Sequence, residues 1–313
     1  MRRFVSSVKA SVLQKLQSKL LLAAENGNIA KINELLQKPQ AQEIMQARNK
    51  HRCTALMLAA KAGHIEIVRV LIAACTNTNI EEIINQRDIF GNTALILAVA
   101  AGHTDIVTIL LMIKGIDVNS ATYFKNDSAL ILAAKKNHTQ IVAALLAVLQ
   151  INLSHTNRDG RTALMCAAKF GHFETVKILL EKPEIQLQLG QKDLYYATTL
   201  SLADISAHFN TKLISYLINL MSFEELGCAT RTLLSDETKK IASEKMKAFV
   251  STTADQLAKH AAFTGIQQGP AQIVLDYAFD EKTWNPLFNI HRNASDESDQ
   301  EEDVVIKTSS LKL

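Results

Sequence analysis

The residues that could do nucleophilic chemistry together lie in the last third of the chain. Cys228 could act as the nucleophile, His260 as its base, and an acidic residue such as Asp255 or Asp276 could orient the histidine. No local catalytic motif surrounds Cys228, and roughly 70 residues without a predicted strand are few for an independent active site. We therefore predict that the protein is not an enzyme. A catalytic C-terminal region that uses Cys228 and His260 is the alternative.

A second group of chemically versatile residues consists of four histidines at regular intervals. His64, His103, His138 and His172 are separated by 39, 35 and 34 residues. A ladder of metal ligands would produce such a series, but each histidine directly follows a glycine or an asparagine inside a longer repeated motif. That context favours a structural role, so we predict no metal and no cofactor. A phosphate-binding glycine loop is also not predicted, because Gly265 and Gly269 lack the Lys and Ser or Thr that should follow.

The longer motif occurs in four near-copies, at residues 53–72, 92–111, 127–146 and 161–180. Each copy starts with a hydroxyl residue, which can cap the first turn of a helix: Thr54, Thr93, Ser128 and Thr162. An apolar stripe at helical spacing follows, and then a residue that tolerates the left-handed conformation and can end the helix: Gly63, Gly102, Asn137 and Gly171. A second amphipathic helix completes each copy. A period in the thirties indicates a repeat array.

This pattern of turn, helix, tight loop and helix resembles the ankyrin repeat. The chain departs from the consensus of that family at two positions. Alanine replaces proline at Ala55, Ala94, Ala129 and Ala163, and apolar residues replace histidine at Met57, Ile96, Ile131 and Met165. The resemblance implies an all-α ankyrin-repeat solenoid of about five to six repeats. It also implies that the four histidines after the helix ends bond to the backbone. We expect apolar packing to replace the missing consensus histidines.

We predict four segments along the chain. Residues 1–19 form an N-terminal capping helix, residues 20–220 the ankyrin-repeat solenoid, residues 221–290 a small helical C-terminal module, and residues 291–313 a disordered acidic tail. Longer connections at residues 37–48 and 73–87 should form loop extensions or lengthen the second helix. In an atypical sixth repeat, Thr199 is expected at the cap position, and Asp204 replaces the second alanine.

Both ends of the chain allow more than one interpretation. Residues 1–24 are basic and contain no acidic residue, which also fits a transit peptide or peripheral attachment to a membrane surface. The acidic block at residues 295–303, close to the C-terminus, resembles the export signal of substrates of the bacterial type IVB secretion system. Alternatively it folds back as an autoinhibitor into a basic groove, or it is only a solvating tail.

Composition suits a monomeric, cytoplasmic protein, or one delivered into the cytosol of a host cell. The net charge of +3 is too small to indicate nucleic-acid binding, and the four cysteines lack disulfide or zinc-site spacing. No apolar run reaches the roughly 18 residues of a membrane-spanning helix.

The resemblance places protein binding in the groove between the turn tips and the first helices. Basic and aromatic residues at these positions predict a partner with an acidic or helical segment. The candidate binding residues are Arg52, Lys61, Phe90, Tyr123, Phe124, Lys125, Lys135, Lys136, Arg158, Lys169 and Phe170.

Overall fold

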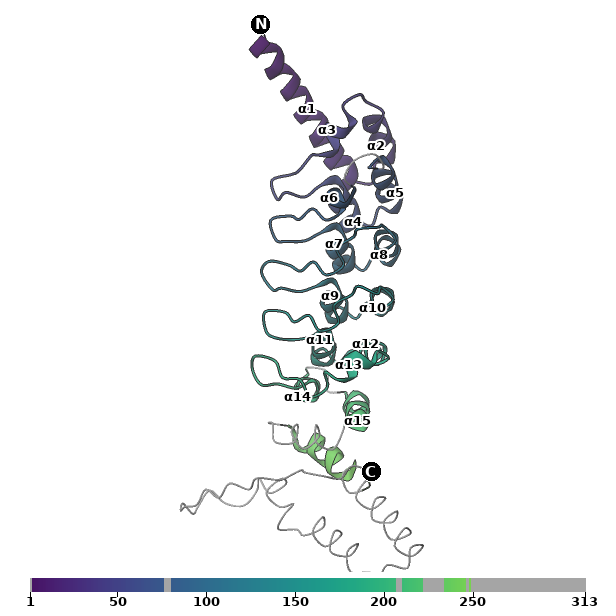
Figure 1. Cartoon of the computed structure of the whole chain (residues 1–313), viewed down its shortest axis with the longest axis vertical. Coiled ribbons are helices and arrows are strands. Elements are labelled where there is room, and N and C mark those ends of the chain that lie inside the picture. The colour runs from purple at the N-terminus through teal and green to yellow at the C-terminus, as the bar shows by residue number, and fades with distance from the viewer. Residues whose placement is uncertain (1, 76–79, 207–209, 222–233, 246–247, 249–313) are drawn as a thin grey trace, which may run out of the picture. The chain divides into compact units, whose positions relative to one another are not determined.

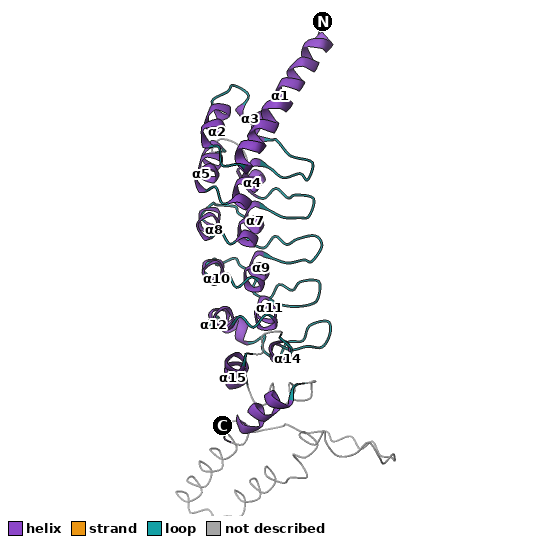
Figure 2. Cartoon of the chain, turned by 180° about the vertical axis from the view of Figure 1, so that it is seen from behind, coloured by secondary structure: helices purple, strands orange, loops and turns teal. Residues whose placement is uncertain are grey.

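The computed structural model describes residues 2–75, 80–206, 210–221, 234–245 and 248, with side chains from residue 11 onward. The chain divides into two compact units, Met1–Ala248 and Phe249–Leu313, and all described residues lie in the first. Within this unit the helices form two parallel columns, and hairpin loops project from one side of them (Figures 1 and 2). We call the ends of these loops the tips.

Each repeat contributes one helix to each column (Figure 1). The two helices of each of the four regular repeats are α4 (Ala55–Ala62) and α5 (Ile65–Ala74), α7 (Ala94–Ala101) and α8 (Thr104–Leu111), α9 (Ala129–Lys135) and α10 (Thr139–Leu146), and α11 (Ala163–Lys169) and α12 (Phe173–Leu180). The terminal pairs are α1 (Arg2–Glu25) with α2 (Ile29–Leu36), and α14 (Thr199–Asp204) with α15 (Thr211–Leu220). The predicted all-α repeat fold is confirmed.

The predicted helix caps are present in all four regular repeats. The hydroxyl oxygens of Thr54, Thr93, Ser128 and Thr162 each accept a hydrogen bond from the backbone N–H three residues later, at 3.2–3.4 Å. The residues that were expected to end the first helices have positive φ angles: 85° at Gly63, 81° at Gly102, 58° at Asn137 and 70° at Gly171. The apolar replacements of the consensus histidine are buried. Local sequence therefore sets the length of every first helix.

The histidines connect successive repeats through the backbone. Nε2 of His64 donates to the carbonyl of Glu25, that of His103 to Lys61, and that of His172 to Lys135, at 3.0–3.1 Å. The predicted structural role is thus confirmed for these three. Nε2 of His138 is buried without a partner, and burial, followed by the nearby charge of Lys136, lowers the pKa of this ring, so His138 is neutral at neutral pH.

Glycine is needed at the helix ends for a second reason, which is the packing of the next repeat. The rings of His64, His103 and His138 lie against the glycines of the repeats before them, Gly27, Gly63 and Gly102. A Cβ atom on Gly63 would lie 2.7 Å from Cε1 of His103. At the one helix end without glycine, the Asn137 side chain accepts a hydrogen bond from Thr175 Oγ1 of the next repeat at 2.7 Å.

The longer connections were predicted wrongly, because each forms a separate short helix. These are α3 (Ala41–Met45), α6 (Ile80–Ile84) and α13 (Pro183–Gln186), which occurs in a connection not singled out from sequence. Ile44, Ile84 and Ile185 are buried, so one apolar side chain anchors each helix to the stack.

At the N-terminal end, the predicted capping segment and the first helix of the first repeat are one continuous helix, α1. Leu20, Ala23 and Ala24, near its end, are buried against the stack. Among the described residues, no helix combines the length and the apolar character needed to cross a membrane.

At the C-terminal end, the sixth repeat starts one residue earlier than predicted. Thr198, not Thr199, caps α14, and its hydroxyl accepts from the N–H of Ser201 at 3.3 Å. His208, which follows Thr198 by ten residues as His64 follows Thr54, lies outside the described residues, and Asn210 caps α15. The atypical Asp204 is almost fully buried and accepts hydrogen bonds from Ser235 N, Ser235 Oγ and Thr238 Oγ1 at 2.5–2.6 Å. Asp204 therefore joins the last repeat to the helix at residues 236–245.

Candidate protein-binding surface

The tips are rigid turns built around one polar side chain each. In four of the five, a side-chain oxygen of Asn or Asp accepts from the N–H groups two and four residues later, at 2.8–3.0 Å: Asn49, Asp88, Asn157 and Asp193. Backbone hydrogen bonds between the first and fourth residues also close turns at residues 49–52, 88–91 and 157–160. In the remaining tip, Thr122 Oγ1 accepts from the N–H of Asp127 instead.

Backbone hydrogen bonds also join neighbouring tips into one row. Each donor N–H lies in one tip and the accepting carbonyl in the tip before it, at 2.9–3.1 Å. The pairs are Ile89 to His51, Tyr123 to Phe90, Arg158 to Lys125, and Leu194 to Asp159. Because the row is continuous, the backbones of the tips have fixed positions relative to one another.

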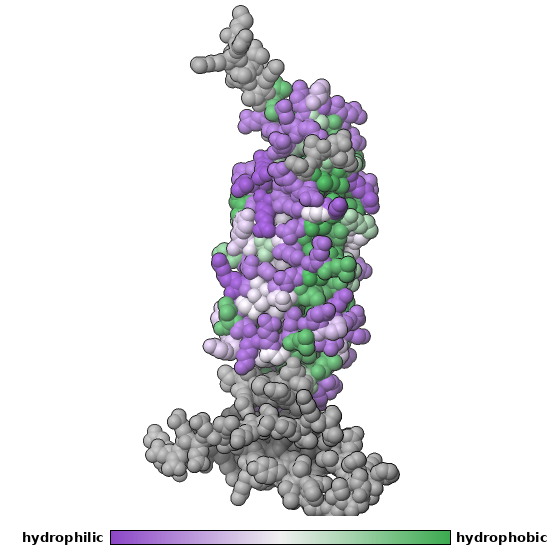
Figure 3. All heavy atoms as spheres, in the orientation of Figure 1, coloured by the Kyte–Doolittle hydropathy of each residue, from purple (hydrophilic) through white to green (hydrophobic). Residues whose placement is uncertain are grey.

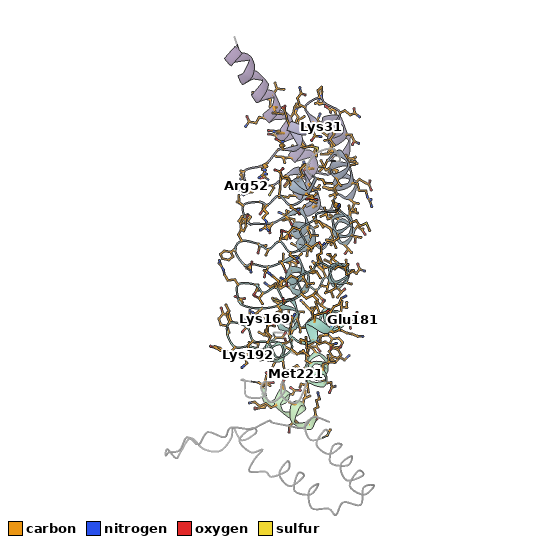
Figure 4. The ribbon with its side chains drawn as sticks, viewed as in Figure 1. Lys31, Arg52, Lys169, Glu181, Lys192 and Met221 are labelled. Atoms are coloured by element: carbon orange, nitrogen blue, oxygen red, sulfur yellow. The ribbon has the colours of Figure 1, made fainter. Side chains whose placement is uncertain are left out.

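A cleft of about 310 Å³ lies where the tips and first helices of the fourth and fifth repeats meet. Its lining comes from the tips at residues 122–127 and 157–161 and from α9 and α11. The lining residues are Phe124, Lys125, Lys135, Asn157, Arg158, Asp159, Arg161, Cys166, Lys169 and Phe170. In Figure 4, Arg52 and Lys192 mark the side of the tips and Glu181 marks the opposite, outer side of the stack. Lys169 lies between these two sides.

The cleft is positively charged, because five of its residues are cationic and only Asp159 is acidic. Two of the cations have acidic partners. Lys135 contacts Asp127 at 2.6 Å, and Arg161 contacts Asp193 at 2.8 Å and Asp159 at 3.1 Å. Within the described part of the chain, Lys125, Arg158 and Lys169 form no such ion pair. These three side chains are therefore available to an anionic ligand.

Exposed aromatic rings accompany the cations. Phe124 is 72% exposed, and the guanidinium of Arg158 lies 5.7 Å from the centre of its ring. Arg87 lies in the same way over Tyr123, and His51 stacks on Phe90. Figure 3 shows small hydrophobic areas among hydrophilic ones along the edge where the tips lie. This mixture of rings and cations is typical of protein-binding surfaces.

The structure brings six of the eleven predicted binding residues together in the cleft: Phe124, Lys125, Lys135, Arg158, Lys169 and Phe170. Arg52, Phe90 and Tyr123 lie on tips outside it, while Lys61 and Lys136 are exposed at the ends of α4 and α9. Sequence reasoning missed Arg161 and the exposed tip residues Leu194, Tyr195 and Tyr196. The sequence does contain a signal that could have predicted the tip with Tyr195 and Tyr196. Asp193 precedes the helix cap Thr198 by five residues, which is the same spacing as between Asp88 and the cap Thr93.

Cys166 is the cysteine that lines this cleft. Burial raises the pKa of the Cys166 thiol, at the base of the cleft, to about 12, so it remains protonated at neutral pH. Cys228 and His260 lie outside the described residues. In the part of the chain that the structure describes, no three His, Cys, Asp or Glu side chains are grouped to hold a metal ion.

Comparison with known proteins identifies the repeats. A family model described as ankyrin repeats (3 copies) matches residues 20–122 and 120–193, which together make up more than half of the chain. No curated protein matches the chain. The helix pairs, the capped tips and this match lead to one conclusion: the chain belongs to the ankyrin-repeat family.

Proposed function

We propose that the protein is a non-enzymatic adaptor that binds an acidic segment of a partner protein in the cleft between the fourth and fifth repeats. Ankyrin repeats generally mediate protein–protein interaction, so a role of this kind follows from the family. The observation that supports the acidic segment is the group of three cations without ion-pair partners, Lys125, Arg158 and Lys169, beside two exposed phenylalanines.

The cleft is formed by a single copy of the protein, and its geometry can hold such a segment without a second copy. A hydrogen bond fixes the backbones of Arg158 and Lys125 relative to each other before a ligand arrives, so the backbone of the cleft requires little ordering on binding. The guanidinium of Arg158 lies over the Phe124 ring and forms no ion pair within the described part of the chain, so the N–H groups at its edge can donate to carboxylates. A peptide in an extended or helical conformation could present acidic side chains to these groups.

Reversing two charges should abolish most of this binding. The double variant Lys125→Glu, Lys169→Glu is expected to bind a peptide of eight glutamates at least about tenfold more weakly than the wild type, because attraction becomes repulsion. Fluorescence anisotropy at low ionic strength measures this affinity, and added salt should weaken the wild-type interaction. The matched control reverses two exposed lysines outside the cleft, Lys114→Glu and Lys177→Glu, which changes the net charge by the same amount and should bind like the wild type. Equal affinity of the double variant and the control would contradict the proposed site.

A more specific role, delivery into a host cell as a bacterial effector, rests on the C-terminal sequence alone. The acidic block at residues 295–303 resembles an export signal and lies outside the described residues. We expect a reporter enzyme fused to the N-terminus of the full chain to reach the host cytosol from a bacterium with a type IVB system. The same fusion without residues 291–313 should remain in the bacterium; transfer of both would contradict this role.

A further inference from the structure

The fifth tip, at residues 193–197, precedes the first helix of the sixth repeat and presents three large apolar side chains in succession. Leu194, Tyr195 and Tyr196 are 69%, 68% and 78% exposed. Their exposure is fixed by the turn, because Oδ1 of Asp193 accepts from the N–H groups of Tyr195 and Ala197 at 2.8 and 2.9 Å. The side chains of two tyrosines and one leucine are therefore exposed to solvent, where they contribute little to the stability of the fold.

The backbone conformation at Tyr196 is not one expected for a tyrosine that only stabilises the fold. Its φ angle is 61°, a left-handed conformation that glycine adopts freely and a bulky residue does not. At the equivalent position two other tips have glycine, Gly91 and Gly160, and the first tip has Arg52 with the same φ angle of 61°. A tyrosine here is strained and gains almost no burial in return. Residues held in strained conformations are concentrated at functional sites.

The fifth tip is continuous with the cleft. Arg161 lines the cleft, and its guanidinium lies 5.6 Å from the centre of the Tyr195 ring. The N–H of Leu194 donates to the carbonyl of Asp159, another residue of the cleft lining, at 3.0 Å. A peptide lying in the cleft would therefore reach this tip within a few residues of its length.

We infer that the fifth tip is the apolar anchor of the binding surface. The partner segment combines acidic residues, which contact Lys125, Arg158 and Lys169, with a large apolar residue at one end that packs against Leu194, Tyr195 and Tyr196. This inference rests on the proposed function, since it specifies the partner of the same surface. Tyrosine is among the residues that contribute most at protein interfaces, because it buries a large area and loses little conformational freedom.

Two kinds of probe separate the anchor from the charged cleft. One is a peptide of eight glutamates, and the other is the same peptide with a tryptophan added at one end or the other. For the wild type, we expect tryptophan at one of the ends to strengthen binding about fivefold. In Tyr196→Gly this gain should disappear, while the affinity for the peptide without tryptophan stays unchanged.

Thermal unfolding of the same variant tests the alternative that Tyr196 stabilises the fold and does not bind a partner. If Tyr196 served the fold, Tyr196→Gly would lower the melting temperature; we expect it to be equal or higher, because glycine suits this φ angle. Met112→Ala replaces a residue that is 79% exposed at the end of α8 and should keep the tryptophan gain. Absence of binding by any probe would contradict the proposed function. Binding in which tryptophan adds nothing, or in which Tyr196→Gly retains the gain, would overturn the anchor alone.

Discussion

Replacing Gly63 by alanine is expected to lower the free energy of unfolding by about 3 kcal/mol. Two effects add at this position. The φ angle of 85° is unfavourable for any residue with a Cβ atom, and that atom would lie 2.7 Å from Cε1 of His103. The ring cannot simply move aside, because its Nε2 donates to the carbonyl of Lys61 in the last turn of α4. The loop between α4 and α5 would therefore have to shift away from the next repeat.

Urea denaturation followed by circular dichroism measures this loss. Gly190→Ala is the control, since Gly190 is exposed and is not among the described residues with positive φ. A double-mutant cycle with His103→Ala separates the two effects, because removing the ring should reduce the cost of the added Cβ and leave only the backbone strain. A free energy of unfolding for Gly63→Ala within about 0.5 kcal/mol of the wild type would contradict this explanation.

Replacing Asp204 by alanine is expected to release the helix at residues 236–245 from the last repeat. The free energy that holds this helix should fall by about 3 kcal/mol, because the variant leaves the three donors of Ser235 and Thr238 without their acceptor. In the inner repeats, the residue at the position of Asp204 is Ala60, Val99, Ala134 or Ala168, and it is fully buried. Within the described residues, no further repeat follows to cover that position in the last repeat, and the carboxylate binds the start of the helix at residues 236–245 instead.

Hydrogen exchange measures the release locally. Amide protons of residues 239–245 should exchange faster in Asp204→Ala, while those of α7 and α9 keep their protection. Asp236→Ala removes an exposed carboxylate from the same helix start, 3.8 Å from Lys239, and should have little effect. If Asp204→Ala and Asp236→Ala show the same exchange at these amides, Asp204 does not hold the helix.

Local features of the repeats could be predicted because each depends on a few neighbouring residues. A hydroxyl residue before Ala-Leu caps a helix wherever it occurs, and glycine at Gly63 or Gly102 ends one for reasons that involve only its own backbone. In the sixth repeat the cap was predicted at Thr199, one residue too late. The start of that repeat was therefore misplaced, and the fifth tip before it was not recognised. Two adjacent threonines offer the same capping group, but only Thr198 has a serine three residues later, Ser201, whose hydroxyl accepts from the N–H of the cap residue and completes a capping box.

The sequence by itself determined the repeat, its period, the helix ends and the likeness to the ankyrin family. The tertiary structure decided which charges remain available for a partner. Arg161 and Lys125 look alike in the sequence, yet Arg161 is paired with Asp193, which lies 32 residues away in the next tip, while Lys125 has no ion-pair partner among the described residues. Periodicity fixes the sequence spacing of such residues, but the distance between their side chains depends on how the repeats stack. For the same reason, only the folded chain shows that residues of two repeats meet in one cleft.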